Sequence, residues 1–239
     1  MSGHSKWATT HRQKAIVDAK RGAIFTKYGN LITIAARTGG DPETNPSLRA
    51  AIDRAKSVSM PKDNIERAIK KGTGELSGDQ VEEIYYEGIV PPSLQVVVKC
   101  ATDNKNRSSS NVRHIFSKNG GSLGSVLWNF EQLGVIKIEK DVLKESNVNH
   151  DELELELIDL GVNDYIKEEE GLIIQTKVED LHKIKDYLKD KELLVNSSEI
   201  EYVAKDKVDL DGADQEKAER IFSELEDNED VSDFYSNLA

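Results

Sequence analysis

The chain has 239 residues, a length that predicts two or three compact domains. Charged residues make up 32% of the chain and its net charge is −12, which is typical of a protein with a well-solvated surface. No apolar run approaches the roughly 18 residues of a membrane-spanning helix, and no apolar segment with a cleavage site follows Met1. We therefore expect a cytoplasmic protein with no membrane partner.

The cysteine content excludes two classes of site. Cys100 is the only cysteine, so neither an intramolecular disulfide nor a multi-cysteine metal site can form. The apolar run LQVVVKCA around it predicts a strand, which favours a buried, inert thiol over a nucleophile.

The charge changes sign along the chain. Residues 1–71 contain 14 Lys and Arg against 6 Asp and Glu, a net charge of +8, whereas residues 72–239 contain 18 against 38, a net charge of −20. A basic segment joined to an acidic body is typical of a protein that meets a polyanion on one side only, because the body repels phosphate. Two domains that merely differ in composition are the alternative.

The first 72 residues predict a small helical bundle. A long first helix has its apolar positions on one side of a 3.6-residue wheel, namely Ile16, Val17, Ile24, Tyr28, Leu31, Ile34 and Ala35. Asn45 is the predicted N-cap of a second helix, with Pro46 at its first position. A third helix starts at Pro61 and ends at Gly72, and the polar, glycine-containing run GTGELSGDQ that follows predicts a domain linker.

Residues 134–204 show the order β-α-β-β-α-β, which is the ferredoxin-like pattern. The ends of such a unit come close together, so it can be inserted into a host domain. We expect an α+β multidomain chain: a basic helical domain (1–72), a discontinuous α/β domain (79–133 plus 205–239), and a ferredoxin-like domain (134–204) inserted into it. Continuous tandem domains are the alternative.

Motifs for catalysis, metals and cofactors are weak. GGSLG places Ser122 in a G-x-S-x-G pattern, with His150 and His182 downstream, but a basic helix precedes it where a nucleophile elbow needs a strand. His4 and His11 have no third ligand nearby, and DLDG lacks most of a calcium loop. No phosphate-binding loop is present. We predict no catalytic residues, metal, cofactor or small-molecule substrate, and keep a Ser122 hydrolase only as a disfavoured alternative.

Basic residues and one aromatic ring cluster at the N-terminus. Cations bind phosphate by releasing counterions, and a flat ring stacks on a base or sugar. The candidate nucleic-acid-binding residues are Lys6, Trp7, His11, Arg12, Lys14, Lys20, Arg21 and Lys27. A second candidate patch on a predicted helix contains Arg107, Arg113, His114 and Lys118. The alternative for both sets is an ordinary solvated helix face.

Several segments resemble one known family. These are GHSKWATT, DAKRGAIFTK, AARTGGDPETNPSLRAAIDRAK, MPKDNIERAIKKG, IYYEG, CATDNKNRSSSNVRHIFSKNGG and the closing VDLD and EDNEDVSDFYSN. Together they resemble the YebC/PmpR family of probable transcriptional regulatory proteins, which is similar to the mitochondrial translational activator of cytochrome oxidase. The resemblance implies a helical domain followed by two α/β domains, and a non-enzymatic cytoplasmic role in transcription or at the ribosome.

The chain departs from that family at the turn after Gly88. The family usually continues YEGYGP with glycine, whereas Ile89, Val90, Pro91 and Pro92 follow Gly88 here. Our main hypothesis is a regulator that binds DNA through the basic N-terminal domain. Two alternatives are a ribosomal-RNA-associated translation factor that relieves stalls, and an adaptor whose acidic body holds a basic partner from the ribosome or the transcription machinery.

Overall fold

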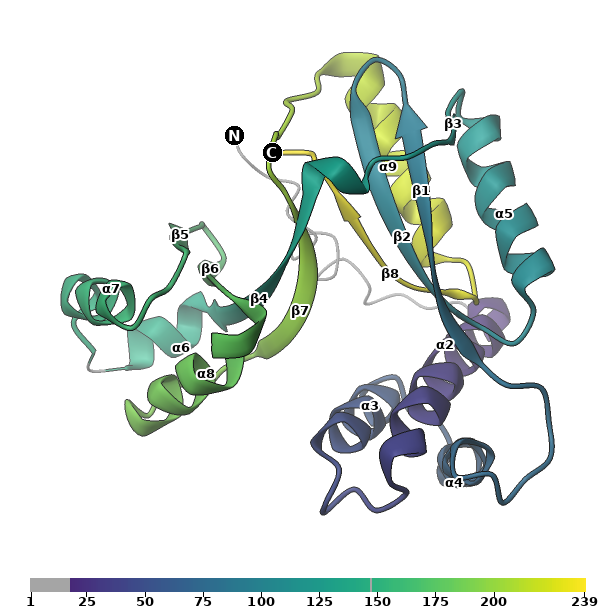
Figure 1. The fold of residues 1–239 in the computed structure, drawn as a ribbon, viewed down its shortest axis with the longest axis horizontal. Helices are drawn as coiled ribbons and strands as arrows, with labels where there is room; N and C mark the ends of the chain where they lie inside the picture. The colour runs from purple at the N-terminus through teal and green to yellow at the C-terminus, as the bar shows by residue number, and fades with distance from the viewer. Residues whose placement is uncertain (1–17, 147) are drawn as a thin grey trace. The chain divides into compact units, whose positions relative to one another are not determined.

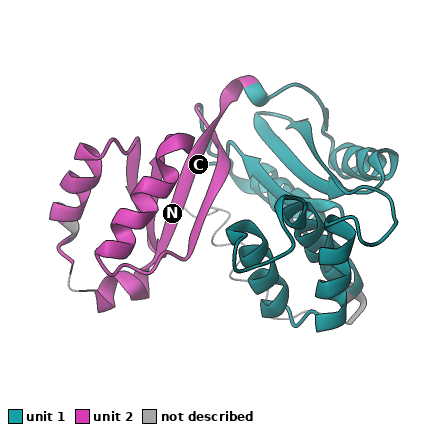
Figure 2. Cartoon of the chain, turned by 60° about the horizontal axis from the view of Figure 1, so that its bottom comes forward, with its two compact units in different colours: residues 1–127, 206–239 teal, residues 128–205 magenta. Residues whose placement is uncertain are grey.

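The computed structural model describes residues 18–146 and 148–239, which form two compact units (Figure 2). The described residues of unit 1 are 18–127 and 206–239, and those of unit 2 are 128–146 and 148–205. The mixed α+β class is confirmed, with two four-stranded antiparallel sheets. Among the described residues, no helix is both long and apolar enough to cross a membrane.

Among the described residues 18–81, three helices and one short 3-10 helix form the first part of unit 1 (Figure 1). Their bounds are α2 Asp18–Ala35, η1 Ala36–Thr38, α3 Pro46–Ser57 and α4 Lys62–Gly72. The predicted start of α3 is confirmed, because the Asn45 side chain accepts a hydrogen bond from the amide N–H of Leu48, at 3.0 Å, and Pro46 follows. The core of this part is apolar and includes Ile32, Leu48 and Ile65.

Close packing of α4 on α2 explains the glycine at the end of α4. A Cβ atom on Gly72 would lie 2.7 Å from the Cβ of Ala36 and would also collide with the carbonyl oxygen of Thr33. Both contacts are shorter than folded proteins tolerate, and one is with rigid backbone. The absence of a side chain at Gly72 therefore lets the two helices approach each other.

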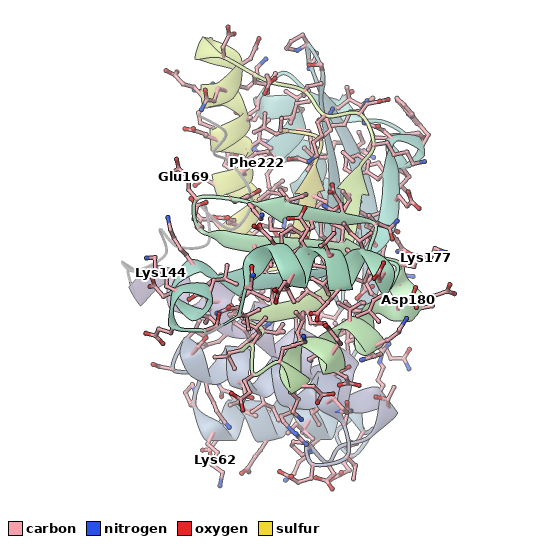
Figure 3. The ribbon with its side chains drawn as sticks, turned by 90° about the vertical axis from the view of Figure 1, so that its left-hand side faces the viewer. Lys62, Lys144, Glu169, Lys177, Asp180 and Phe222 are labelled. Carbon is pink, nitrogen blue, oxygen red and sulfur yellow. The ribbon has the colours of Figure 1, made fainter. Side chains whose placement is uncertain are left out.

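The rest of unit 1 is a four-stranded sheet in the order β3-β1-β2-β8, with helices α5 and α9 sharing a core with it (Figure 1). The element bounds are β1 Glu82–Val90, β2 Leu94–Thr102, α5 Lys105–Lys118, β3 Ser122–Leu123, α9 Gly212–Glu226 and β8 Val231–Ser236. The core includes Val98, Phe116 and Phe222; Phe222, labelled in Figure 3, stacks on Phe234 with ring centroids 5.1 Å apart. The thiol of Cys100 lies in this core, as predicted.

The YYEG segment of β1 has a structural role. The Glu87 carboxylate accepts hydrogen bonds from the backbone N–H groups of Val126 and Leu127, at 2.6 and 2.8 Å, and so holds the segment that leads out of unit 1. A Cβ on Gly88 would overlap the ring of Phe116, so glycine is required where α5 covers the sheet. Ile89, Val90, Pro91 and Pro92, where the resemblance to the family is expected to break, lie at the end of β1 and in the turn into β2.

Polar contacts join the helical part of unit 1 to its sheet. Asn30 on α2 is buried, and its side-chain amide donates a 2.8 Å hydrogen bond to the carbonyl oxygen of Ala101 on β2. The Arg37 guanidinium donates to the carbonyl oxygen of Val81, just before β1. A buried amide must keep its partner, so the Asn30 bond fixes where α2 meets the sheet. The Arg37 bond ties η1 to the segment before β1.

Unit 2 is a sheet in the order β5-β6-β4-β7, with helices α7 and α8 sharing its main core (Figure 1). The element bounds are η2 Leu127–Asn129, β4 Phe130–Glu139, α6 Lys140–Glu145, α7 His150–Asp159, β5 Asp164–Lys167, β6 Gly171–Thr176, η3 Val178–Asp180, α8 Leu181–Asp190 and β7 Ser197–Ala204. The first strand of the unit, β4, pairs with the last, β7, in antiparallel register. β4 begins four residues before the predicted boundary at 134, because Phe130 already pairs with Ala204.

Candidate nucleic-acid interface

The predicted N-terminal site lies mostly outside the described residues. Lys6, Trp7, His11, Arg12 and Lys14 fall in the segment 1–17, which the structure does not describe. Lys20 and Arg21 belong to the first turn of α2, but their side chains are likewise not described. For these seven residues, nucleic-acid binding stays a prediction from the sequence.

Lys27 is the described member of that set, and it is partly buried on α2. Burial lowers the pKa of Lys27, while the carboxylates of Glu226 and Asp227, near the end of α9, act in the opposite direction. Its ammonium group thus lies close enough to acidic groups of the α/β part of unit 1 to interact with them. Lys27 is therefore less suited to contact an external phosphate than a fully exposed lysine is.

Arg107, the first member of the second predicted patch, is used by the fold. Its Nε donates to Oδ2 of Asp230 at 3.0 Å, and its Nη2 donates to Oδ1 of the same carboxylate at 2.6 Å. The Asp230 side chain is fully buried, whereas 38% of the Arg107 side chain is exposed. This two-point hydrogen bond raises the pKa of Arg107. Arg107 therefore neutralises a buried carboxylate.

The Arg107 ion pair extends into the helical part of unit 1. Nη2 of Arg107 lies 3.2 Å from Oδ1 of Asp103, and Nζ of Lys71, at the end of α4, lies 3.7 Å from Oδ2 of Asp103. Asn104 caps α5 by accepting a hydrogen bond from the amide N–H of Arg107, which fixes the start of the helix. A chain of alternating charges thus runs from α4 to Asp230, next to the start of β8.

The other members of the α5 patch differ from one another. Nζ of Lys118 pairs with Oε1 of Glu224 on α9 at 3.0 Å. Arg113 and His114 are exposed, and neither has an ion pair or hydrogen bond with its side chain among the described residues. The structure thus divides the predicted patch of four into two ion-paired residues and two exposed cationic or titratable residues.

Sequence reasoning missed two cations on α4. Arg67 and Lys70 are exposed and three residues apart, so they lie on one side of the helix, and within the described part of the chain neither side chain has an ion-pair partner. By contrast, Lys62, which projects from the ribbon in Figure 3, pairs with Glu66, and Arg49 pairs with Glu43. The inward position of Ile65 and Ala68 was the sequence signal that could have placed Arg67 and Lys70 outside.

The described residues offer little for other chemistry. Within 18–146 and 148–239, no group of three or more His, Cys, Asp or Glu side chains is placed to hold a metal ion. Ser122 lies within the two-residue strand β3, so the strand-turn-helix setting of a nucleophile elbow is not found there. Burial raises the pKa of the Cys100 thiol to about 12, which disfavours the nucleophilic thiolate at neutral pH.

We predict that Arg107→Ala lowers the free energy of unfolding by about 2–3 kcal/mol, because it leaves the buried Asp230 carboxylate without its cation. Lys118→Ala is the matched control, since it removes an exposed ion pair on the same helix and is expected to cost less than about 1 kcal/mol. Urea unfolding of both variants measures the difference. Equal stability of the two variants would contradict the structural role assigned to Arg107.

Comparison with known proteins matches nearly the whole chain. The description "TACO1/YebC protein N-terminal domain" matches residues 5–75, and "TACO1/YebC second and third domain" matches residues 81–238. A probable transcriptional regulatory protein of Chloroherpeton thalassium is 49% identical over 100% of this chain and 95% of the relative. Another, from Pelotomaculum thermopropionicum, is 45% identical over 99% of this chain and 98% of the relative.

A solved structure has the same fold. The crystal structure of a conserved hypothetical protein from Aquifex aeolicus matches with a TM-score of 0.77 and 38% sequence identity. The match covers 98% of this chain and 97% of that one.

Proposed function

Because the chain belongs to the TACO1/YebC family, we propose that it is a non-enzymatic regulator of gene expression that binds DNA through its basic N-terminal part. Full-length relatives named probable transcriptional regulatory proteins support a role in transcription. The net charge of +8 on residues 1–71, against −20 on the remainder, supports the placement of the nucleic-acid contacts.

The observation that carries the proposal is the presence of exposed cations on α4 that are not held in ion pairs within the described part of the chain. Arg67 and Lys70 have no ion-pair partner among the described residues, whereas Lys71 and Arg107 are held by Asp103. A cation that is already paired gains little from a phosphate, because binding must first break the existing pair. The unpaired cations of α4 therefore extend the basic segment that the sequence predicts.

Phosphate contact by such cations is largely independent of base sequence. Each lysine or arginine that neutralises a phosphate releases a condensed counterion, so affinity falls steeply as salt rises. The acidic remainder of the chain repels the polyanion, which favours contact through the basic part. This mechanism needs neither a metal nor a catalytic group.

We predict that Arg67→Ala/Lys70→Ala weakens duplex DNA binding and makes the slope of log K against log salt shallower by about 2, since two phosphate contacts are lost. Fluorescence anisotropy at several salt concentrations measures both quantities. Lys177→Ala/Lys185→Ala is the matched control, because it removes two exposed lysines from unit 2; Lys177 is labelled in Figure 3.

The predicted N-terminal cations are tested in the same titration. Exchange of Lys6, Arg12 and Lys14 for Glu is expected to weaken binding sharply, from a wild-type slope near −3 to −4 if about four phosphates are neutralised. Unchanged affinity and slope in this variant and in the α4 variant would refute DNA binding through the basic part. A loss in the unit 2 control alone would move the interface elsewhere.

Ribosomal RNA is the second candidate target, because it offers the same phosphates as DNA. The description of the chain's family also includes TACO1, the mitochondrial translational activator of cytochrome oxidase, which favours a role at the ribosome. The two targets differ in where the protein is found. A DNA-directed regulator is expected to sediment apart from ribosomes in a sucrose gradient of cell lysate. Comigration with ribosomes that is lost after ribonuclease treatment would replace DNA by ribosomal RNA as the target.

A further inference from the structure

The helix α7 of unit 2 has an outer face that combines apolar and acidic side chains. Leu155 is 65% exposed and Ile158 is 55% exposed, although both are large apolar residues. They are three residues apart on a helix, so they lie side by side. Single exposed leucines are ordinary, but a pair on one helix face can serve as an anchor for a partner.

The inner face of α7 is already fully used by the fold. Leu153 and Leu157 have no exposed surface and belong to the core of unit 2. Between them and the solvent, Glu156 accepts a 2.5 Å hydrogen bond from the Tyr187 hydroxyl and pairs with Nζ of Lys191 at 2.7 Å. These contacts hold α7 against α8, so the outer apolar pair is not needed to attach the helix.

Carboxylates flank the exposed apolar pair. Glu152 lies three residues before Leu155 and Asp159 four residues after it, so both are on the outer face. Both are exposed, and neither has an ion-pair partner among the described residues. Residues 145–166 contain seven Asp and Glu and no Lys or Arg. Lys167 on β5 pairs with Asp151 and Glu154 of the same helix, at 3.8 and 3.0 Å, so this cation is used by other carboxylates than Glu152 and Asp159.

The same charge bias extends over the whole unit. Residues 128–205 contain 20 Asp and Glu against 10 Lys and no Arg, a net charge of −10. A nucleic acid or an anionic membrane would be repelled by this surface. A ligand for the α7 face must instead bring apolar side chains for Leu155 and Ile158 and positive charges for the carboxylates beside them.

We propose that the outer face of α7 is a docking site for a lysine- and arginine-rich amphipathic helix of a protein partner. Its apolar side chains pack on Leu155 and Ile158, and its cations pair with Glu152 and Asp159. The contact is small, because α7 is only 10 residues long, so the interaction belongs to the weak, transient class of interfaces below about 1,200 Å². It is separate from the proposed nucleic-acid contacts, which use unit 1.

The test uses the full chain and a synthetic probe. The probe is a peptide of about 14 residues, or four helical turns, built from Leu and Lys at helical spacing. A scrambled peptide of identical composition has the same charge but no apolar face. Binding is measured by isothermal titration calorimetry, and the contact surface is mapped by amide chemical-shift changes in NMR spectra.

We expect the amphipathic peptide to bind more tightly than the scrambled one, with shift changes centred on α7. Leu155→Gln/Ile158→Gln is expected to weaken binding at least about tenfold, because it removes the apolar anchors. Glu152→Gln/Asp159→Asn is expected to weaken it less and to reduce its salt dependence. Leu194→Gln is the control, because Leu194 is 69% exposed but lies outside α7. The affinity of this variant for the amphipathic peptide is expected to match that of wild type.

Several results would overturn the proposal. Equal binding of the scrambled peptide, or full affinity of the Leu155→Gln/Ile158→Gln variant, would show that only general acidity is involved. A wild-type dimer in analytical ultracentrifugation that this variant converts to a monomer would assign the face to a second copy of the chain. Because the variant changes only unit 2, its DNA affinity is expected to equal that of wild type, so this test and that of the proposed function can fail separately.

Discussion

The buried carboxylate of Asp230 is the constraint on which the arrangement of unit 1 depends. A buried carboxylate needs a cationic partner, and Arg107 is that partner, because it donates two hydrogen bonds to Asp230. Arg107 also contacts Asp103, which lies near Lys71 of the helical part. Together with the buried hydrogen bond from Asn30 to β2, this network joins the basic helices to the α/β part of unit 1. Ion pairs and hydrogen bonds between these side chains therefore connect the helical part of unit 1 to its sheet.

The same network determines which cations remain for a partner. Lys118 and the other ion-paired residues contribute their charge to the fold, and a phosphate would have to compete with carboxylates for them. Arg67 and Lys70 on α4, and Arg113 with His114 on α5, are exposed and unpaired within the described part of the chain. Unit 2 carries a net negative charge, and its helix α7 has exposed carboxylates around a pair of exposed apolar side chains. The described surface thus has exposed cations on unit 1 and exposed carboxylates around an apolar pair on unit 2.

Local signals predicted much of the secondary structure, whereas the pairing of charges depended on contacts distant in sequence. The cap by Asn45 and the helix start at Pro46 depend on neighbouring residues and could be predicted. Arg107 was predicted as a surface cation because its partner Asp230 is 123 residues away, and no spacing rule connects them. Lys27 was likewise predicted to be an exposed cation, because the sequence around it does not show that it becomes partly buried in the folded chain. The mixed α+β class could be predicted correctly, because it follows from the apolar periodicity of each segment, which is a local property of the sequence.

We propose that the basic N-terminal part of the chain is the surface that contacts nucleic acid. The most direct measurement is ultraviolet cross-linking of the full chain to bound nucleic acid, followed by peptide mass spectrometry. We expect cross-linked peptides from residues 1–72, with any further adducts on α5 around Arg113 and His114. Adducts confined to unit 2, with none in residues 1–72, would contradict it.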